Sequence, residues 1–288
     1  MRIIRAINKM QRLAIGIKRD GKSIGFVPTM GALHNGHLSL IRQARKENDF
    51  VVVSIFVNPA QFGPNEDFRS YPGMLKADVS VCRKAGVDII FYPEAGKIYP
   101  QGYKTYVFIE KLSGALCGKY RCGHFRGVAT IVTKLFNIIQ PAVAYFGQKD
   151  AQQAIIIKQL VRDLNMPVKI KVMPIIREQD GMALSSRNSY LSAKERGDAN
   201  VLYAALGKAR TMIKQGAVNT ASIILAMRKI IQGKKTANIQ YIEIVDLNEL
   251  KPVKKIKGKV LIALAAWIGK TRLIDNIIVK RRYKNSQF

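Results

Sequence analysis

The chain has 288 residues, of which 48% are hydrophobic and 23% are charged, and its formal net charge at neutral pH is +29. This composition is typical of a globular protein and excludes a disordered chain, while the length favours two domains or one large one. The longest apolar run, residues 260–268, is too short to span a bilayer. Because the start of the chain also lacks the continuous apolar segment of a signal peptide, we expect a cytoplasmic protein with no membrane association.

The positive charge is dispersed along the whole chain, with the densest groups at residues 251–259 and 280–284. A strong positive charge can indicate a nucleic-acid partner or an anionic membrane surface. Dispersed charge without an arginine-rich arm provides no binding geometry, so the pattern favours solvated basic faces. We therefore expect no specific nucleic-acid partner, although an anionic substrate would benefit from the field.

Strands and helices alternate through the first 175 residues. Apolar runs of strand length stand at residues 24–27, 51–57, 87–92, 143–146 and 168–174. Helical periodicity begins at Leu38 and recurs at residues 74–84, 128–139 and 151–164. Buried strands that alternate with helices predict an α/β domain over residues 1–175, built on a Rossmann-like parallel sheet with both faces covered.

After Ile176 the pattern changes. Amphipathic helices are predicted at residues 199–214 and 220–231, followed by strands at 239–245 and 260–267 that a basic loop joins. No helix separates these two strands, so a parallel crossover is excluded between them. The sequence thus predicts a smaller α+β domain over residues 176–288.

The segment between the first predicted strand and its helix, residues 28–37, contains two of the three histidines of the chain, His34 and His37. Three residues apart on a helical turn, the two imidazoles face the same way. A helix N-terminus offers free N–H groups and a positive dipole end that suit phosphate oxygens, and Gly31 and Gly36 allow a ligand to approach the backbone. The pattern predicts a nucleoside-triphosphate site, with an exposed histidine pair as the open alternative.

Two other strand ends carry polar groups. Gln61 follows the strand at 51–57 and could offer its amide to a small polar substrate, or be an ordinary loop residue. In residues 145–153, Lys149 could supply charge to phosphates, and Asp150 could hold a ribose hydroxyl or cap the helix; Gln153 follows on the same face. Because the carboxyl ends of parallel strands meet at one edge, we expect these loops and residues 28–37 to line one crevice.

Three further groups are candidates for chemistry. The polar loop 177–188 includes Ser185, Ser186 and Arg187, which could close over a triphosphate as a mobile lid, or belong to a flexible interdomain connection. His124 could touch substrate, although a lone histidine in a loop is more often structural. Asp78 is a candidate carboxylate for magnesium.

In their order and combination, the motifs of this chain resemble the pantoate–β-alanine ligase (pantothenate synthetase) family of the nucleotidylyltransferase superfamily. The motifs that carry the resemblance are Pro28-Thr29-Met30-Gly31 with the histidine pair, Ser54-Ile55-Phe56-Val57-Asn58-Pro59 with Gln61-Phe62, Gly123-His124-Phe125-Arg126-Gly127-Val128, Lys134-Leu135-Phe136-Asn137, Phe146-Gly147 with Lys149-Asp150 and Gln152-Gln153, Ala183-Leu184-Ser185-Ser186-Arg187-Asn188, and Arg272-Leu273-Ile274-Asp275-Asn276.

The resemblance implies that ATP and pantoate form pantoyl adenylate and release pyrophosphate, and that β-alanine then attacks the adenylate to give pantothenate and AMP. Magnesium would accompany the ATP. The family is typically a homodimer whose C-terminal domain acts as a lid.

Residue by residue, the resemblance implies that His37 is a proton donor and that His34 contacts phosphate. Together with Lys149, Ser186 and Arg187 they form the predicted catalytic set. Gln61 and Gln153 would hold pantoate, with Gln61 also near β-alanine. The implied ATP site comprises Met30, Gly31, Ala32, Leu33, His34, Asn35, Gly36, His37, Gly147, Gln148, Lys149, Asp150, Ile176, Leu184, Ser185, Ser186 and Arg187.

The chain departs from the family pattern at four positions. Ala60 replaces a methionine, Gln148 a glutamate, Gly73 an arginine and Cys122 a proline. The first two lie beside substrate and ATP residues. Two alternatives stay open: another adenylate- or cytidylyl-forming enzyme of the same superfamily, and a basic nucleic-acid-binding protein on a degenerate catalytic fold, which would bind RNA with a steep salt dependence.

Overall fold

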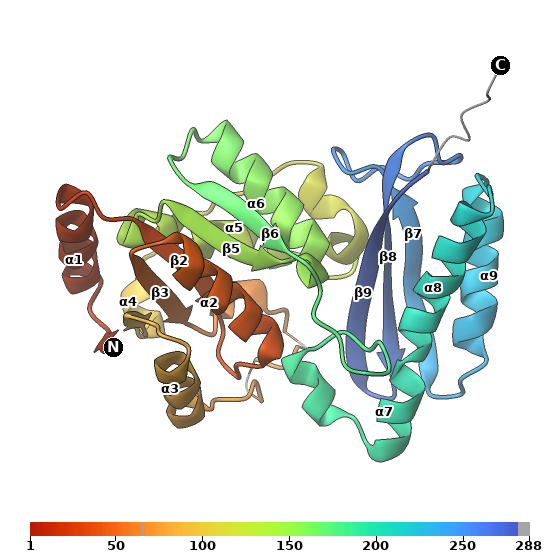
Figure 1. The fold of residues 1–288 in the computed structure, drawn as a ribbon, viewed down its shortest axis with the longest axis horizontal. Helices are drawn as coiled ribbons and strands as arrows, with labels where there is room; N and C mark the ends of the chain where they lie inside the picture. The colour runs from red at the N-terminus through yellow and green to blue at the C-terminus, as the bar shows by residue number, and fades with distance from the viewer. Residues whose placement is uncertain (65, 69, 282–288) are drawn as a thin grey trace. The chain divides into compact units, whose positions relative to one another are not determined.

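The computed structural model describes residues 1–64, 66–68 and 70–281, so the end of the second basic group, residues 282–284, lies outside the described residues. The chain divides into two compact units (Figure 1). The N-terminal unit comprises residues 1–114 and 118–176. The C-terminal unit comprises Ala115–Cys117 and the chain from Arg177 onward.

The N-terminal unit is built on a six-stranded sheet in the order β1-β4-β3-β2-β5-β6, and every described pairing in it is parallel. The strands are β1 (Arg2–Ile4), β2 (Ile24–Thr29), β3 (Phe50–Ile55), β4 (Ile89–Phe91), β5 (Val143–Gly147) and β6 (Lys169–Met173). Val51, Val52 and Val53 are all fully buried, although successive side chains of a strand point to opposite faces. Both faces of the sheet are therefore covered, which confirms the Rossmann-like prediction.

Helices cover the two faces. They are α1 (Ile7–Arg19), α2 (Asn35–Glu47), α3 (Leu75–Lys84), α4 (Ala95–Ile98), α5 (His124–Ile139) and α6 (Ala151–Asp163). Ile41 of α2 and Cys82 of α3 share one apolar cluster with Val27 of β2. On the other face, Phe26 of β2 meets Phe136 of α5 with ring centroids 6.3 Å apart. Adjacent residues of β2 thus anchor helices on opposite sides.

Several boundaries differ from the sequence prediction. β1 and α1 were not predicted. A strand of three residues is too short to show alternation, and the many basic residues of α1 obscure the apolar periodicity of a helix. α5 begins four residues earlier than predicted, because Gly123 turns the chain into it with φ of 78°. α2 begins at Asn35 because a histidine side chain caps its first turn.

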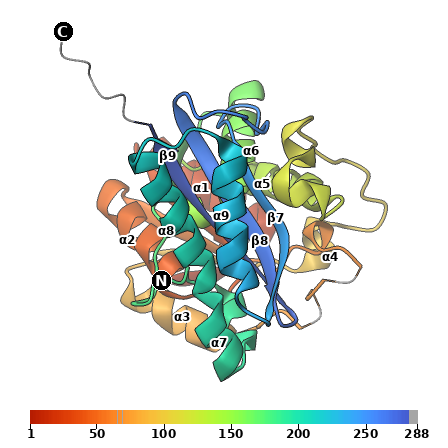
Figure 2. The ribbon, with the colours of Figure 1, turned by 90° about the vertical axis from the view of Figure 1, so that its right-hand side faces the viewer.

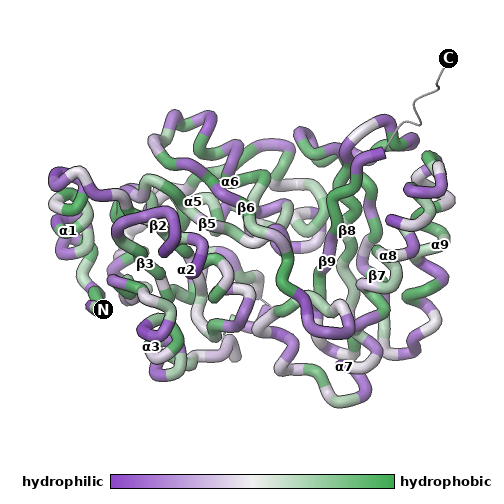
Figure 3. Tube along the Cα trace, in the orientation of Figure 1, coloured by the Kyte–Doolittle hydropathy of each residue, from purple (hydrophilic) through white to green (hydrophobic). Residues whose placement is uncertain are grey.

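The C-terminal unit packs helices on a three-stranded antiparallel sheet in the order β7-β8-β9. Its elements are α7 (Ala193–Ala199), α8 (Val201–Lys214), α9 (Thr220–Gln232), β7 (Ala237–Val245), β8 (Lys259–Ile268) and β9 (Thr271–Lys280). α8 and α9 lie side by side across one face of the sheet (Figure 2). β8 is apolar along almost its whole length (Figure 3). The predicted α+β class is confirmed, and β9 is added to it.

The helix stripe predicted on α9 lies in the core of this unit. Ile223, Met227 and Ile231 are fully buried and share one cluster with Ile262 and Leu264 of β8. Burial of such side chains supplies the main stabilisation of a small unit of this kind, at about 1.5–3 kcal/mol for each one. None of the described helices is long and apolar enough to cross a membrane.

Candidate active site

The strand order brings three loops to one edge of the N-terminal sheet. β2 pairs with β3 on one side and with β5 on the other. The chain runs outward from β2 through β3 and β4, then returns to start β5 on the opposite side of β2. This reversal is a topological switch point, the place where open α/β sheets bind ligands. The loops after β2, β3 and β5 therefore meet at one edge, as the sequence predicts.

The loop after β2 is held in an uncommon shape by a buried carboxylate. Gly31 has φ of +89° and Ala32 has φ of +51°, which places both residues in the left-handed region. Asp78 of α3, only 2% exposed, accepts the backbone N–H of Ala32 at 3.0 Å and that of Leu33 at 2.8 Å. A Cβ on Gly31 would lie 3.0 Å from this carboxylate. Burial raises the pKa of Asp78, whereas the two N–H groups favour its charged form.

The histidine pair caps α2. His34 Nδ1 accepts the backbone N–H of Gly36 at 3.1 Å, and His37 Nδ1 accepts the backbone N–H of His34 at 3.3 Å. The two rings lie with their centroids 4.2 Å apart. Because each Nδ1 is an acceptor, the proton of each neutral imidazole is on Nε2. Local backbone geometry thus selects the tautomer of both side chains.

The same surroundings keep the two imidazoles neutral. Burial, together with the Lys149 charge, lowers the pKa of His34 to about 4. Burial and the neighbouring His34 lower the pKa of His37 to about 3, with Asp150 opposing the shift. At neutral pH each imidazole therefore carries a single N–H, at Nε2, which is a hydrogen-bond donor.

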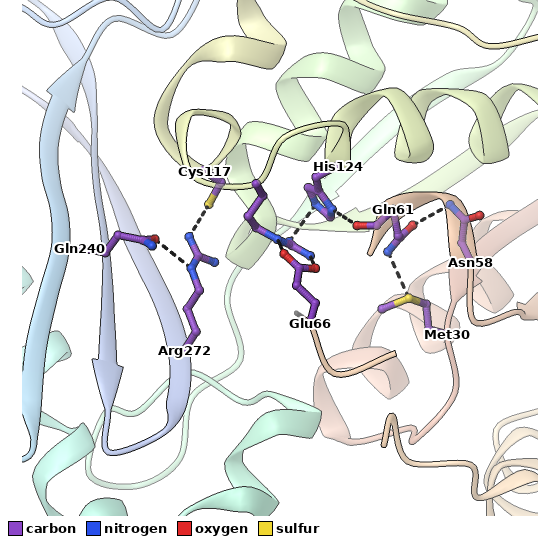
Figure 4. A network of polar contacts seen from close by, with 9 residues as sticks. Met30, Asn58, Gln61, Glu66, Cys117, His124, Gln240 and Arg272 are labelled. Carbon is purple, nitrogen blue, oxygen red and sulfur yellow. Dashed lines mark hydrogen bonds and ion pairs between the residues drawn. The ribbon is translucent and has the colours of Figure 1, made fainter. Parts of the chain in front are cut away.

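Gln61 is oriented by its neighbours on the loop after β3 (Figure 4). Its side-chain oxygen accepts the amide N–H of Asn58 at 3.0 Å, and its own amide nitrogen lies 3.1 Å from the sulfur of Met30. Asn58 is 1% exposed and also donates to the carbonyl of Gly127 at 3.1 Å. The amide of Gln61 therefore has one orientation, which is set by Asn58, three residues after the end of β3.

The third histidine supports the same loop. His124 Nδ1–H donates to the backbone carbonyl of Gln61 at 2.8 Å, and Arg121 donates to its Nε2 at 3.0 Å. Arg121 in turn forms a bidentate ion pair with Glu66, at 2.7 and 2.6 Å. Burial and the Arg121 charge lower the pKa of His124 to about 4. All three histidines of the chain thus lie on the segments that border this sheet edge.

Helix α5 and the Gln61 loop approach each other closely at a glycine. A Cβ on Gly127 would lie 2.1 Å from the carbonyl oxygen of Ala60. A larger residue at position 127 would displace the loop, so the glycine is required by packing and not by its backbone angles. Ala60 itself, one of the departures from the family pattern, contributes its backbone N–H to the cap that Asn58 makes, at 3.3 Å.

The third loop contributes Lys149 and Asp150. Their charged groups lie 3.9 Å apart, and both act electrostatically on the histidine pair. Asp150 is the N-cap residue of α6, but its side chain makes no capping hydrogen bond. Helix capping therefore does not explain an aspartate at this position. Gln153 lies in the first turn of α6 and Ile176 closes the N-terminal unit; both are half-buried.

The remaining predicted residues belong to the C-terminal unit. Ser185 caps a short 3₁₀ helix, Ser186–Tyr190, by accepting the backbone N–H of Arg187 at 3.3 Å. Leu184, Ser185, Ser186 and Arg187 are all half-buried. Each unit therefore holds its own part of the predicted set, with the histidines, Lys149 and the two glutamines in the N-terminal one.

Sequence reasoning placed Asn58 at the crevice without giving it a role, and it missed Glu66 and Arg121 as members of the site. Asn58 had a usable signal, because it follows the end of a buried strand. The Glu66–Arg121 pair had none, since 55 residues separate the partners. Within the described residues, no group of three His, Cys, Asp or Glu side chains could hold a metal ion.

Comparison with known proteins identifies the architecture. The model of the family Pantoate-beta-alanine ligase matches residues 2–278. A pantothenate synthetase from Caldicellulosiruptor bescii is 53% identical over 282 residues, covering 98% of this chain and 100% of that protein. One from Thermosipho melanesiensis is 54% identical over 279 residues, covering 97% of this chain and 99% of that protein.

Solved structures agree with the sequence relatives. A crystal structure of pantothenate synthetase from Thermus thermophilus has a TM-score of 0.91 and 42% identity, covering 96% of this chain and 99% of that one. A pantoate-beta-alanine ligase from Francisella tularensis, complexed with beta-gamma ATP and beta-alanine, has a TM-score of 0.80 and 38% identity, covering 96% and 97%.

Proposed function

The chain belongs to the pantoate–β-alanine ligase family, and we propose that the loops at its N-terminal sheet edge carry out the two steps of that reaction. The enzyme condenses pantoate with β-alanine to pantothenate through a pantoyl adenylate, with ATP converted to AMP and pyrophosphate. The observation that carries the site assignment is the pair of neutral Nε2–H donors on His34 and His37, one strand away from the oriented amide of Gln61.

In the first step a carboxylate oxygen of pantoate attacks the α-phosphorus of ATP, and the bond between the α-phosphate and the bridging oxygen breaks. Negative charge develops on the departing pyrophosphate. We assign its stabilisation to His34, His37 and Lys149, since fixed donors aimed at developing charge need no reorganisation during the reaction. His37 thus donates a hydrogen bond to the developing charge through its Nε2–H.

The nucleotide site follows the family pattern on the positions of this chain. Residues 30–37 form the phosphate-facing loop and helix start, residues 147–150 the second loop, and Ile176 the adenine side. Ser186 and Arg187, with Leu184 and Ser185 beside them, close over the triphosphate as part of a C-terminal lid. A closing lid protects an acyl adenylate that water would hydrolyse.

Gln61 and Gln153 hold pantoate. The side-chain oxygen of Gln61 accepts the amide N–H of Asn58, so the Gln61 amide nitrogen faces Met30. On that side its N–H can donate to a substrate oxygen. In the second step the uncharged amine of β-alanine attacks the acyl carbon of the adenylate, AMP leaves, and the amine nitrogen loses a proton. Gln61 also borders the β-alanine position.

Magnesium would be held chiefly through the triphosphate. The described residues offer no group of three ligands, and the oxygens of Asp78 already accept two backbone N–H groups. Such an ion would keep several of its waters and have few protein ligands, with Asp78 as a nearby carboxylate. When bound, the ion neutralises charge on the leaving pyrophosphate.

The active protein is a cytoplasmic homodimer. An extended segment, residues 103–109, runs outside the described helices and strands, and it exposes Tyr106 (47%) and Phe108 (59%). The Arg126 guanidinium lies over the Tyr106 ring, 4.7 Å from its centroid, and the backbone N–H of Val107 donates to Thr130 at 3.0 Å. A tethered segment that presents aromatic side chains suits self-association through a second copy.

Pyrophosphate release tests the function. Wild type is assayed with ATP and pantoate, with and without β-alanine, beside His37→Ala and His37→Gln. We expect sustained release only with both substrates, a loss of about 10²- to 10³-fold in His37→Ala, and partial recovery in His37→Gln, which keeps an N–H donor. Folded wild type that released no pyrophosphate under any condition would contradict the ligase assignment.

A further inference from the structure

The first part of the polar segment 177–188, which carries the predicted phosphate contacts of the C-terminal unit, is closed into a short hairpin. Arg177 and Ala183 pair as an antiparallel bridge. The backbone N–H of Glu178 donates to the carbonyl of Met182 at 2.8 Å. The residues of this segment therefore have fixed partners before any ligand is considered.

One side chain attaches the hairpin to the sheet. The guanidinium of Arg177 forms a bidentate ion pair with Asp275 of β9, at 2.7 and 2.9 Å. It also donates to the carbonyl of Gly181 at 2.9 Å and lies over the ring of Tyr203 of α8, 4.5 Å from the centroid. Asp275 is only 4% exposed, so this pair is shielded from water, and the loss of either partner would leave an unpaired buried charge.

A second attachment holds the two ends of the turn 185–187. Asn188, just after the turn, donates from its amide to Glu178 at 3.2 Å and to the carbonyl of Ala183 at 3.1 Å. Glu178 is itself paired with Arg196 of α7 at 2.6 Å. The turn therefore starts directly after the hairpin, and Asn188 ties its far end back to Glu178 and Ala183 of the same hairpin.

We propose that Asp275 is a positioning residue for the turn 185–187, because its ion pair with Arg177 holds the turn in its phosphate-binding shape before the nucleotide arrives. The proposal rests on the proposed function for the identity of the ligand, the triphosphate of ATP. Donors fixed in advance bind and stabilise charge without an ordering cost. The role also gives Asp275, within the Arg272–Asn276 motif, a place in the site although it would touch no substrate.

The test compares Asp275→Asn with Asp198→Asn. Asp198 is the control because it also forms an ion pair in the same unit, with Lys234 at 3.0 Å, and its printed partners, Lys234 and Thr236, lie outside the hairpin. Amide hydrogen exchange is measured over residues 184–188 without nucleotide, and KM is measured for ATP and for pantoate. In Asp275→Asn we expect exchange and the KM for ATP to rise roughly tenfold or more, with the KM for pantoate unchanged. The control changes neither.

Two further variants sharpen the test. Arg177→Lys keeps the charge but loses the bidentate fork, so we expect it to reproduce the faster exchange of residues 184–188 even if Asp275→Asn folds poorly. In an Arg187→Ala background, Asp275→Asn should add little to the loss of kcat/KM for ATP, since both act through one turn. Additive losses, or unchanged exchange in folded variants, would overturn the proposal.

The exchange measurement separates this inference from the function. It uses no substrate, so it reports on the turn whether or not the protein makes pantothenate. If wild type released no pyrophosphate, the proposed function would fail while the exchange result stood. If activity were present but exchange did not respond to Asp275→Asn, only the positioning role would fail.

Discussion

The backbone N–H of His34 donates to Nδ1 of His37 at 3.3 Å, so the first histidine of the pair decides which nitrogen of the second carries its proton. A chain segment of four residues thereby presents two Nε2–H donors side by side at a helix start. The tautomers of the two proposed phosphate-binding side chains are in this way set by local backbone geometry, without a carboxylate partner.

We predict that the rate of pantoyl adenylate formation is flat between about pH 6 and 8.5. The pKa values of His34 and His37, about 4 and 3, lie below this range, so both rings stay neutral throughout it. The measurement is single-turnover pyrophosphate release at saturating ATP and pantoate without β-alanine, which removes the titrating amine. A rate that fell as pH rose through about 6.5 would mean that a protonated histidine is required.

The protein should lose stability as pH falls from 7 to 5. The folded-state pKa of His124, about 4, lies below its unfolded value of 6.5, so the unfolded chain binds more protons in this window. His124 is 8% exposed, and its contribution should amount to about 2 kcal/mol by pH 5. Urea unfolding at several pH values tests this. His124→Asn should show a shallower pH dependence, and an identical slope would refute it.

Gly127→Ala should destabilise the protein by about 1–3 kcal/mol and raise the KM for pantoate. The added Cβ would meet the carbonyl oxygen of Ala60 at 2.1 Å and displace the loop that carries Gln61. Gly207→Ala is the matched control, because nothing lies within 4 Å of its Cβ in α8. There alanine should be neutral or stabilising by up to about 1 kcal/mol. Equal effects of the two substitutions on the KM for pantoate would contradict the assignment of the loop.

Phe108→Lys should shift the protein from dimer to monomer in light scattering. Phe108 is 59% exposed on the extended segment 103–109, where a charge would oppose packing of a second copy. Leu225→Lys provides the control, because Leu225 is 55% exposed on α9 and outside the proposed surface. A dimer that survived Phe108→Lys unchanged would exclude this surface.

Much of the N-terminal unit could be predicted from sequence, because its strands are buried on both faces and its helices are amphipathic. The position of β9 could not. Its alternation is interrupted by Asp275 and Asn276, both nearly fully buried, and a polar pair of this kind argues against a core strand. The interruption makes physical sense only once Arg177, 98 residues away, supplies the opposite charge.

The same division applies to the site. Its local chemistry could be read from the residues alone: a glycine-containing turn, two histidines on one helical face and a lysine after a strand, because spacing along a chain fixes which side chains share a turn. Which of these groups meet depends on the fold. The pairing of Glu66 with Arg121, the support of Gln61 by His124 and the clamp of Asp275 on Arg177 join residues that are 55 to 98 positions apart. No local propensity encodes such contacts, since they depend on strand order and on burial that removes the competing water.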